Sequence, residues 1–257
     1  MPAGPLTLDA PWPFPFWIAH RGAGKLAPEN TLAAFRLGAS HGYRAFECDV
    51  KLSADQQPFL LHDATLERTS NGLGAAGDLR WGELSRLDAG AWHSPAFAGE
   101  PLPGLQAIAA YVLGHGFALN IEIKPTPGTE AATGHAVASA CTRLWAGSRA
   151  ALLLSSFHLA ALQAAQACAP QIPRALLLDT LWPNWLDAAR NLACVAVVCN
   201  HRLMDAPLMA DLQAAGLRAL CFTVNDAAEA RRLLALGVHG LITDAVDRFA
   251  PVDGVVS

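Results

Sequence analysis

Two pairs of ionisable residues have the spacing that puts side chains on one face of a strand. One residue separates Glu47 from Asp49, and one separates Glu122 from Lys124, each pair inside an apolar run. Alternate residues of a strand point to the same side, so each pair shares a face. Both faces of a parallel sheet are normally buried, and buried charges need a partner or an ion. Three carboxylates suit Mg²⁺ or Ca²⁺, whereas zinc favours His and Cys ligands.

Two histidines and an arginine lie at the ends of other apolar runs. His20 and Arg21 follow the first such run, and His62 ends a later one. Beside a bound cation, Arg21 and Lys124 would stabilise the charge that a phosphodiester gains in its transition state. We assign removal of a proton from the attacking hydroxyl to His20 and protonation of the leaving alkoxide to His62. An internal ion pair between Glu47 and Lys124 is the structural alternative.

The elements that would position these residues alternate between strand-like and helix-like segments. Short apolar runs recur, each followed by a polar or Gly-rich turn and an Ala/Leu-rich stretch with helical spacing, which is typical of a parallel sheet. Polar residues lie at the carboxyl ends of these runs, where (β/α)8 TIM-type barrels build their sites. We therefore expect a distorted α/β barrel of this type. Its candidate strands are 16–19, 45–50, 118–123, 151–155, 174–178, 195–199, 219–223 and 240–243.

A ninth apolar run interrupts this alternation. Residues 58–62 follow the second strand too closely for a parallel crossover, which needs about a dozen residues. The run is therefore expected to fold back as a hairpin arm. This arrangement would bring His62 to the end of the barrel that carries Asp49.

The segment that follows, residues 64–103, contains several glycines and little periodicity. We expect it to form a small insertion after the hairpin. The periodic segment 105–113 predicts the helix that returns to the barrel. Within the insertion, Trp81 and Trp92 either cover the substrate or form a small local core.

Length and composition fit one barrel domain over residues 1–257, with the insertion at about 64–103. Hydrophobic residues make up 53% of the 257 residues and charged residues 16%, which is enough apolar surface for a large core. The net charge of −4 provides no basic field for nucleic acid or an anionic membrane. Phosphate binding must therefore be local.

Cysteine spacing and hydrophobic runs bear on the location of the protein. Six cysteines form no CxxC pair and no metal-binding spacing, which indicates buried thiols in a reducing compartment. Residues 1–16 mix Pro with Trp and Phe and lack the basic and apolar regions of a signal peptide. No run reaches the roughly 20 apolar residues of a transmembrane helix. We expect a cytoplasmic protein without stable membrane association.

Eight short motifs follow one another in a fixed order between about residues 17 and 247. In this order they resemble the glycerophosphodiester phosphodiesterase family, in its bacterial cytoplasmic form. Each motif alone is weak, whereas eight in family order on the expected strands form a specific pattern. The motifs are His20-Arg21-Gly22; Pro28-Glu29-Asn30-Thr31 with Ala34-Phe35; Glu47-Cys48-Asp49-Val50; His62-Asp63 with Leu66, Arg68 and Thr69; Asn120-Ile121-Glu122-Ile123-Lys124; Ser155-Ser156-Phe157; Thr223-Val224-Asn225; and Gly240-Leu241-Ile242-Thr243-Asp244.

The resemblance implies a barrel enzyme that hydrolyses small glycerophosphodiesters, such as glycerophosphocholine or glycerophosphoethanolamine. The products would be glycerol 3-phosphate and an alcohol, formed by attack of water or by way of a cyclic intermediate. The insertion would shape a pocket for the glycerol end. The implied roles are metal ligation by Glu47, Asp49 and Glu122, proton transfer by His20 and His62, and phosphate binding by Arg21 and Lys124.

One position departs from the family pattern. Phe222 stands where many members carry tryptophan before Thr-Val-Asn. The aromatic face is kept and the indole donor is lost, which bears on specificity for the alcohol. We therefore assign Phe222 to substrate binding.

Two alternatives belong to other functional classes. A phospholipase D-like relative of the same barrel would act on lysolipids or sphingolipids, but such relatives generally lack the insertion, and a lysophospholipid assay separates the two. A catalytically silent barrel would only bind phosphorylated ligands. The presence of both histidines, all three acidic residues and both cations argues against the silent barrel.

Overall fold

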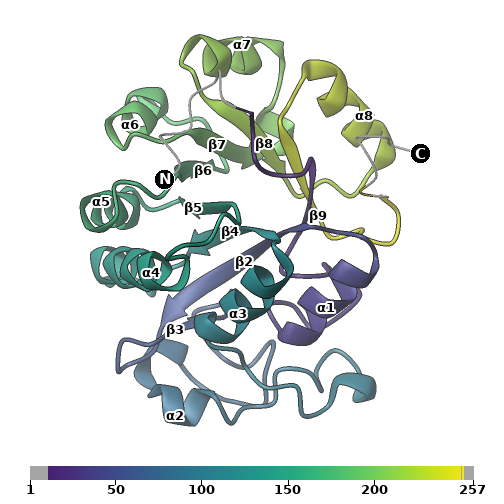
Figure 1. Ribbon diagram of the computed structural model, residues 1–257, viewed down its shortest axis with the longest axis vertical. Helices are drawn as coiled ribbons and strands as arrows, with labels where there is room; N and C mark the ends of the chain where they lie inside the picture. The colour runs from purple at the N-terminus through teal and green to yellow at the C-terminus, as the bar shows by residue number, and fades with distance from the viewer. Residues whose placement is uncertain (1–10, 250, 252–257) are drawn as a thin grey trace.

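Eight parallel strands form a closed barrel in the part of the chain that the computed structural model describes, residues 11–249 and residue 251 (Figure 1). The first strand pairs with both the second and the last, which closes the ring. The expected TIM-type barrel is therefore confirmed. Residues 1–10, most of the segment in which we expect no signal peptide, lie outside the described residues. The strands are β1 (Trp17–Ala19), β2 (Ala45–Leu52), the additional arm β3 (Pro58–Leu60), β4 (Ala118–Ile123), β5 (Leu152–Ser156), β6 (Arg174–Leu178), β7 (Ala196–Asn200), β8 (Arg218–Phe222) and β9 (Gly240–Thr243).

The strand boundaries lie within two residues of those expected from the apolar runs. The segments 118–123, 174–178 and 240–243 form strands without any shift of their ends. The expected hairpin is also present, because β3 runs antiparallel to β2 with Leu60 opposite Val50.

Helices surround the ring of strands (Figure 1). Polar side chains fix where three of them begin, because Thr31, Asp205 and Asp226 each accept a hydrogen bond from a backbone N–H of the first turn. The helices are α1 (Leu32–Ser40), α2 (Trp81–Leu84), α3 (Leu105–His115), α4 (Glu130–Leu144), α5 (Leu159–Cys168), α6 (Trp185–Asn191), α7 (Ala206–Ala214) and α8 (Ala227–Leu236), with short 3-10 turns at Ala76–Asp78, Pro95–Phe97 and His201–Leu203.

Strand β2 shows how alternation separates packing from chemistry. Phe46, Cys48 and Val50 belong to the large apolar layer between the ring and the helices. Glu47 and Asp49 alternate with them and therefore face the barrel interior. Cys48 packs on the opposite side from its two acidic neighbours, as its spacing predicts.

Apolar side chains fill the barrel interior toward the amino ends of the strands. They come mostly from the first residues of the strands, and Phe14 packs against them with Trp12 stacked on its ring at 5.2 Å. The carboxyl ends of the strands are thus left for polar groups. The members of this inner cluster are Phe14, Ile18, Ala45, Ala118, Leu153, Ala175, Leu177, Ala196, Val198, Leu220 and Ile242.

The insertion lies at one edge of the molecule, next to β3 and opposite α7 (Figure 1). It has its own apolar cluster, in which Leu66 and Leu84 pack with Phe59 of β3. The Trp81 ring lies 6.3 Å from that of Phe59, so this tryptophan joins the local core. Trp92 is 40% exposed, and its indole N–H donates to the carbonyl of Ala89.

A helix that crosses a membrane must be both long and apolar. Among the helices of the described residues, none combines the length with the apolar character that crossing a membrane demands.

Candidate active site

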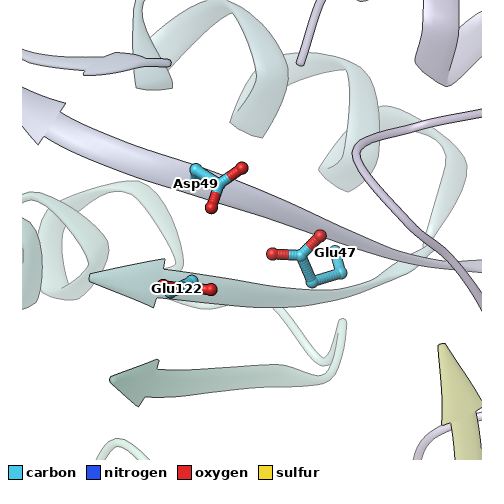
Figure 2. A group of neighbouring side chains, drawn as sticks. All are labelled: Glu47, Asp49 and Glu122. Carbon is cyan, nitrogen blue, oxygen red and sulfur yellow. The ribbon is translucent and has the colours of Figure 1, made fainter. Parts of the chain in front are cut away.

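Three carboxylates from the neighbouring strands β2 and β4 meet in the upper part of the barrel. Figure 2 shows Glu47 and Asp49 along β2 and Glu122 on β4, and the sheet register sets Asp49 opposite Glu122. One oxygen from each side chain lies within 4.8 Å of the others. Glu47 and Asp49 are only 3% and 1% exposed. Glu122 is partly exposed, so the three form a largely buried, all-oxygen ligand set.

The electrostatics of these carboxylates are uneven. Burial and then the charge of Asp49 raise the pKa of Glu47 to about 8, and the same two causes raise the pKa of Glu122. Burial also opposes ionisation of Asp49, but Arg21 and Lys124 outweigh it and hold the pKa of that carboxyl well below its ordinary value. Arg21 Nε lies 3.1 Å from one Asp49 oxygen, and Lys124 Nζ lies 3.4 Å from the other.

Side chains alone do not balance the charge of this region, which fits a divalent cation. Oxygen ligands at a buried site are those that Mg²⁺ or Ca²⁺ prefers. When all of these groups are ionised and both histidines are neutral, six carboxylates and four cationic side chains leave two negative charges, which such a cation would neutralise. The carboxylates are Glu29, Glu47, Asp49, Asp63, Glu122 and Asp244, and the cations are Arg21, Lys51, Arg68 and Lys124.

His20 is held by a carboxylate from the last strand of the barrel. Its Nδ1 lies 2.6 Å from Asp244 Oδ1, and Asn225 Nδ2 donates to the other oxygen of Asp244 at 3.0 Å. A carboxylate accepts but does not donate, so Nδ1 of His20 carries the proton. In the neutral ring Nε2 is then free to accept one. This atom lies 3.7 Å from Glu47.

His62 has a similar arrangement with a carboxylate next to it in the chain. Its Nδ1 lies 2.6 Å from Asp63 Oδ1, which fixes the proton on Nδ1 by the same reasoning. Arg68 Nη2 donates to that Asp63 oxygen at 3.0 Å. Both histidines therefore present Nε2, the atom suited to proton transfer, away from their carboxylate partners.

The two histidines differ in their tendency to hold a proton. Burial lowers the pKa of His62, which nearby Asp49 only partly offsets. Burial also acts against charge on His20, but its hydrogen bond to Asp244 and the charge of Glu47 raise its pKa overall. In the protein without cation or substrate, these directions favour His20 as proton donor and His62 as acceptor. That order is opposite to the one we assign from the sequence, and a leaving-group experiment decides between them.

The loop after β1 depends on residues that allow unusual backbone geometry. Arg21 and Asn30 have φ values of 50° and 61°, and Gly24 has 56°. A Cβ on Gly24 would lie 2.1 Å from the carbonyl oxygen of Asp244, so only glycine allows this close approach. Asn30 Nδ2 donates to Asp49 at 2.8 Å, and Asn30 Oδ1 accepts from the Asp49 backbone at 3.0 Å. The loop is thereby fastened to the carboxylate site.

Arg68 connects the supports of two site residues. Its guanidinium donates to both oxygens of Glu29 at 2.8 Å and also binds Asp63. Glu29 in turn accepts from Arg21 at 2.8 Å, and Asp63 holds His62. Since Arg68 lies at the start of the insertion, the insertion supports the site through this residue.

A pocket of about 220 Å³ opens over these residues, and its lining lies outside the insertion. The expected site residues line it together, apart from Asp49, which contacts the site through its ion pairs. Phe157 and Phe222 form an edge-to-face pair with centroids 5.9 Å apart. The lining residues are His20, Arg21, Glu47, His62, Asn120, Glu122, Lys124, Ser155, Phe157, Leu177, Phe222, Thr223 and Ile242.

Comparison with known proteins shows the family of the chain. Residues 20–248 match the sequence model of the glycerophosphoryl diester phosphodiesterase family. The chain belongs to this family. A glycerophosphodiester phosphodiesterase of Caldanaerobacter subterraneus is 32% identical over 232 residues, which cover 88% of this chain and 93% of that protein. YhdW of Bacillus subtilis is 33% identical, with 90% and 94% covered.

Solved structures of family members share the fold. An Oleispira antarctica phosphodiesterase in complex with its product sn-glycerol-3-phosphate superimposes with a TM-score of 0.83, at 33% identity and with 90% of this chain and 93% of that chain covered. The glycerophosphodiester phosphodiesterase of Agrobacterium tumefaciens gives a TM-score of 0.77 at 28% identity, with 92% and 99% covered. The chain is thus a phosphoric diester hydrolase by family.

Sequence reasoning did not assign roles to the residues that hold the histidines of this phosphodiesterase. Asp63 has a local signal, since it directly follows His62. Asp244 ends the last strand just as His20 ends the first, and this shared position is the signal that was available. The contacts of Arg68 with Glu29 and Asp63 have no comparable signal, because they depend on how the insertion packs.

Replacement of Arg68 by Met is expected to lower kcat/KM of the phosphodiesterase by about 10- to 100-fold, the usual effect of losing a residue that orients site groups. The reason is that Glu29 and Asp63 lose their shared donor, so Arg21 and His62 are less well fixed. Steady-state kinetics on glycerophosphocholine measure this. Arg190→Met removes a surface ion pair with Asp187 and serves as the control. Equal kinetics in the two variants would show that Arg68 is not a positioning residue.

Proposed function

We propose that the protein hydrolyses small glycerophosphodiesters, such as glycerophosphocholine and glycerophosphoethanolamine, to glycerol 3-phosphate and the free alcohol. The observation that carries the proposal is the meeting, at one pocket, of a cluster of three carboxylates with two histidines that are each anchored through Nδ1. The family membership of the chain supports the same reaction.

The proposed cofactor is a divalent cation, Mg²⁺ or Ca²⁺, held by Glu47, Asp49 and Glu122. When bound, such a cation supplies Lewis-acid stabilisation of charge on a phosphate oxygen. Arg21 and Lys124 are proposed to bind the same phosphate. Their position in the pocket beside the carboxylates supports this role. Their positive charges favour the transition state, in which the phosphate gains charge.

Proton transfer is the proposed task of the two histidines. One Nε2 atom takes the proton of the attacking hydroxyl, which belongs either to water or to the glycerol moiety. The other gives a proton to the alkoxide as the bond between phosphorus and the alcohol oxygen breaks. Asp244 and Asp63 keep each ring in the tautomer and orientation that this exchange needs. Neither carboxylate has to be protonated for this role.

The alcohol is proposed to leave past the aromatic pair. Phe157 is 38% exposed, and together with Phe222 it offers an apolar face on the pocket. Because Phe222 has no hydrogen-bond donor, it sets no polar requirement on the alcohol. We expect broad tolerance among small alcohols as a result.

The function is tested by incubating the protein with a divalent cation and a panel of diesters. Glycerophosphocholine and glycerophosphoethanolamine are expected to release glycerol 3-phosphate, which a coupled dehydrogenase assay detects. Lysophosphatidylcholine is the comparison substrate. Turnover of the lysolipid alone would support the phospholipase D-like alternative, and turnover of none would support the silent barrel.

The cytoplasmic location remains part of this proposal. Its support is that all six cysteines are free thiols, as expected in a reducing compartment. Fractionation of cells that express the protein, with detection by antibody, checks it. Recovery in an extracytoplasmic fraction would contradict it.

A further inference from the structure

Two polar side chains on the floor of the pocket have no hydrogen-bond partner among the described residues. Both amide atoms of Asn120 and the hydroxyl of Ser155 are buried and unpaired, and the two residues are 1% and 0% exposed. Both line the pocket. A buried polar group without a partner destabilises the fold, and such groups are rare. A ligand that pairs with them is therefore expected.

The strand register places these two residues next to the carboxylates, on the inner face of the barrel. Asn120 precedes Glu122 by two residues on β4, so both face the interior, and it lies opposite Glu47 of β2. Ser155 lies opposite Glu122 on the other side of β4. The inner apolar cluster supplies the rest of the floor. The polar part of the floor is thus on the side of the proposed cation.

The chemistry of the free atoms selects the kind of group that they bind. Asn120 offers both donor and acceptor atoms, and the hydroxyl of Ser155 can also do both. An ionised phosphate oxygen only accepts, so it would leave the Asn120 carbonyl oxygen unpaired. The quaternary ammonium of choline does neither. A hydroxyl group both donates and accepts, so it can donate to the Asn120 carbonyl oxygen and accept from the Ser155 hydroxyl, which no other part of such a diester can do.

We infer that Asn120 and Ser155 form the glycerol subsite and bind the terminal hydroxyl of the glycerol moiety. The inference rests on the proposed function. Lys124 directly follows β4, nearer its carboxyl end than Asn120, so the phosphate that Arg21 and Lys124 are proposed to bind lies nearer the mouth. The terminal hydroxyl is the glycerol group farthest along the chain from phosphorus. It therefore reaches the floor while the alcohol leaves toward Phe157. Asn120 and Ser155 set specificity for glycerol over shorter or deoxygenated diols.

The test compares glycerophosphocholine with its analogue that lacks this hydroxyl, propane-1,2-diol phosphocholine. The parent enzyme is expected to prefer glycerophosphocholine in kcat/KM by roughly 10- to 100-fold, since two hydrogen bonds are lost and two buried groups stay unpaired with the analogue. In Asn120→Leu, which is close in size, this preference is expected to fall to within about threefold. Equal loss on both substrates, the result if Asn120 held only a water molecule, would overturn the inference.

A second pair of variants controls for folding. Ser155→Ala is expected to reduce the preference and to keep or raise the melting temperature, because its hydroxyl is buried and unpaired in the free protein. Ser156→Ala is the matched control, since Ser156 Oγ donates to the Ile123 carbonyl at 2.6 Å. It is expected to lower the melting temperature and keep the preference. The reverse pattern would assign Ser155 a purely structural role.

Calorimetry separates failure of this inference from failure of the proposed function. Glycerol 3-phosphate is expected to bind Asn120→Leu roughly tenfold more weakly than the parent, whereas inorganic phosphate binds both equally. A parent protein that hydrolyses no diester would refute the proposed function and leave this binding comparison valid. Unchanged affinity of Asn120→Leu for glycerol 3-phosphate would refute the subsite.

Discussion

Exchange of Glu47 for Gln is expected to reduce turnover of glycerophosphocholine by about 10³-fold or more. Loss of a ligand weakens the proposed cation site, whose contribution to such a transition state amounts to several kcal/mol. Gln keeps the shape of the side chain and removes a buried charge, so the variant should fold. The measurements are kcat/KM at saturating Mg²⁺ or Ca²⁺ and the rise in melting temperature that each ion causes, which reports binding to the folded state.

The rise in melting temperature that the cation causes should also depend on pH, because Glu47 must be ionised to bind it. Burial and Asp49 raise the pKa of Glu47 from 4.5 to about 8. In the cation-free protein, protonation of this group stabilises the fold fully below about pH 4.5, and that stability is lost as the pH rises through about 8. A cation needs the ionised carboxylate and removes the repulsion. The rise in melting temperature on adding cation should therefore be larger at pH 8 than at pH 5.5 in the parent, and this difference should be smaller in Glu47→Gln.

Chelation and a surface variant complete this experiment. Exhaustive chelation should abolish turnover in the parent, and added Mg²⁺ or Ca²⁺ should restore it. Glu83→Gln, at an exposed position on α2, should behave as the parent in every measurement. Undiminished hydrolysis by the chelated enzyme would show that the three carboxylates serve another purpose.

The barrel and its acidic site were predictable because both follow from local alternation. In β2, the side chains of Phe46, Cys48 and Val50 pack toward the helices, and this fact forces Glu47 and Asp49 inward. The same reasoning applies to Glu122 on the next strand of the ring. Neither inference needs knowledge of residues distant in the chain. The strand ends moved by one or two residues because end positions depend on turn geometry.

The hydrogen bond between His20 and Asp244 could not be predicted from local alternation. Asp244 is 224 residues away in the chain, and the two meet only because β1 pairs with β9 to close the ring. Gly24 contributes through its close approach to the Asp244 backbone, a packing fact with no periodic signal. Likewise, Asn120 is visible in the sequence only as a polar residue in a strand. Its side-chain amide is unpaired because the neighbouring strands provide no donor or acceptor for it, and that depends on tertiary packing.

The packing of the insertion could not be predicted from the periodicity of its sequence. Its sequence has little periodicity, and its small core forms on Phe59 of β3, outside the segment itself. Two local alternatives therefore remained for each tryptophan. Packing decides them: Trp81 contributes to the core, and Trp92 stays partly exposed. The docking of the segment on the barrel, as in the hydrogen bond from Ala33 N to Glu100 at 2.9 Å, is also a tertiary contact.

Substitution of His20 or His62 by Ala is expected to lower turnover of glycerophosphocholine by about 10²- to 10⁴-fold in each case, the range for a positioned acid or base. Both rings line the pocket and both are anchored through Nδ1, which leaves Nε2 for the substrate. His115→Ala is the control, because His115 lies at the exposed end of α3, where its ring Nδ1 bonds to the Tyr111 carbonyl of the same helix. It should leave the rate within about threefold of the parent.

A change of leaving group then assigns the two roles. p-Nitrophenolate has a low pKa and needs little protonation, so a p-nitrophenyl diester should be far less sensitive to loss of the acid than glycerophosphocholine is. Loss of the base should slow both substrates. Rescue of His62→Ala by the p-nitrophenyl ester would support the order assigned from the sequence, whereas rescue of His20→Ala would support the order that the pKa directions favour. If both variants fold, bind cation and hydrolyse alkyl diesters within about threefold of the parent, far less than the loss expected of an acid or base, the histidine pair has no catalytic role.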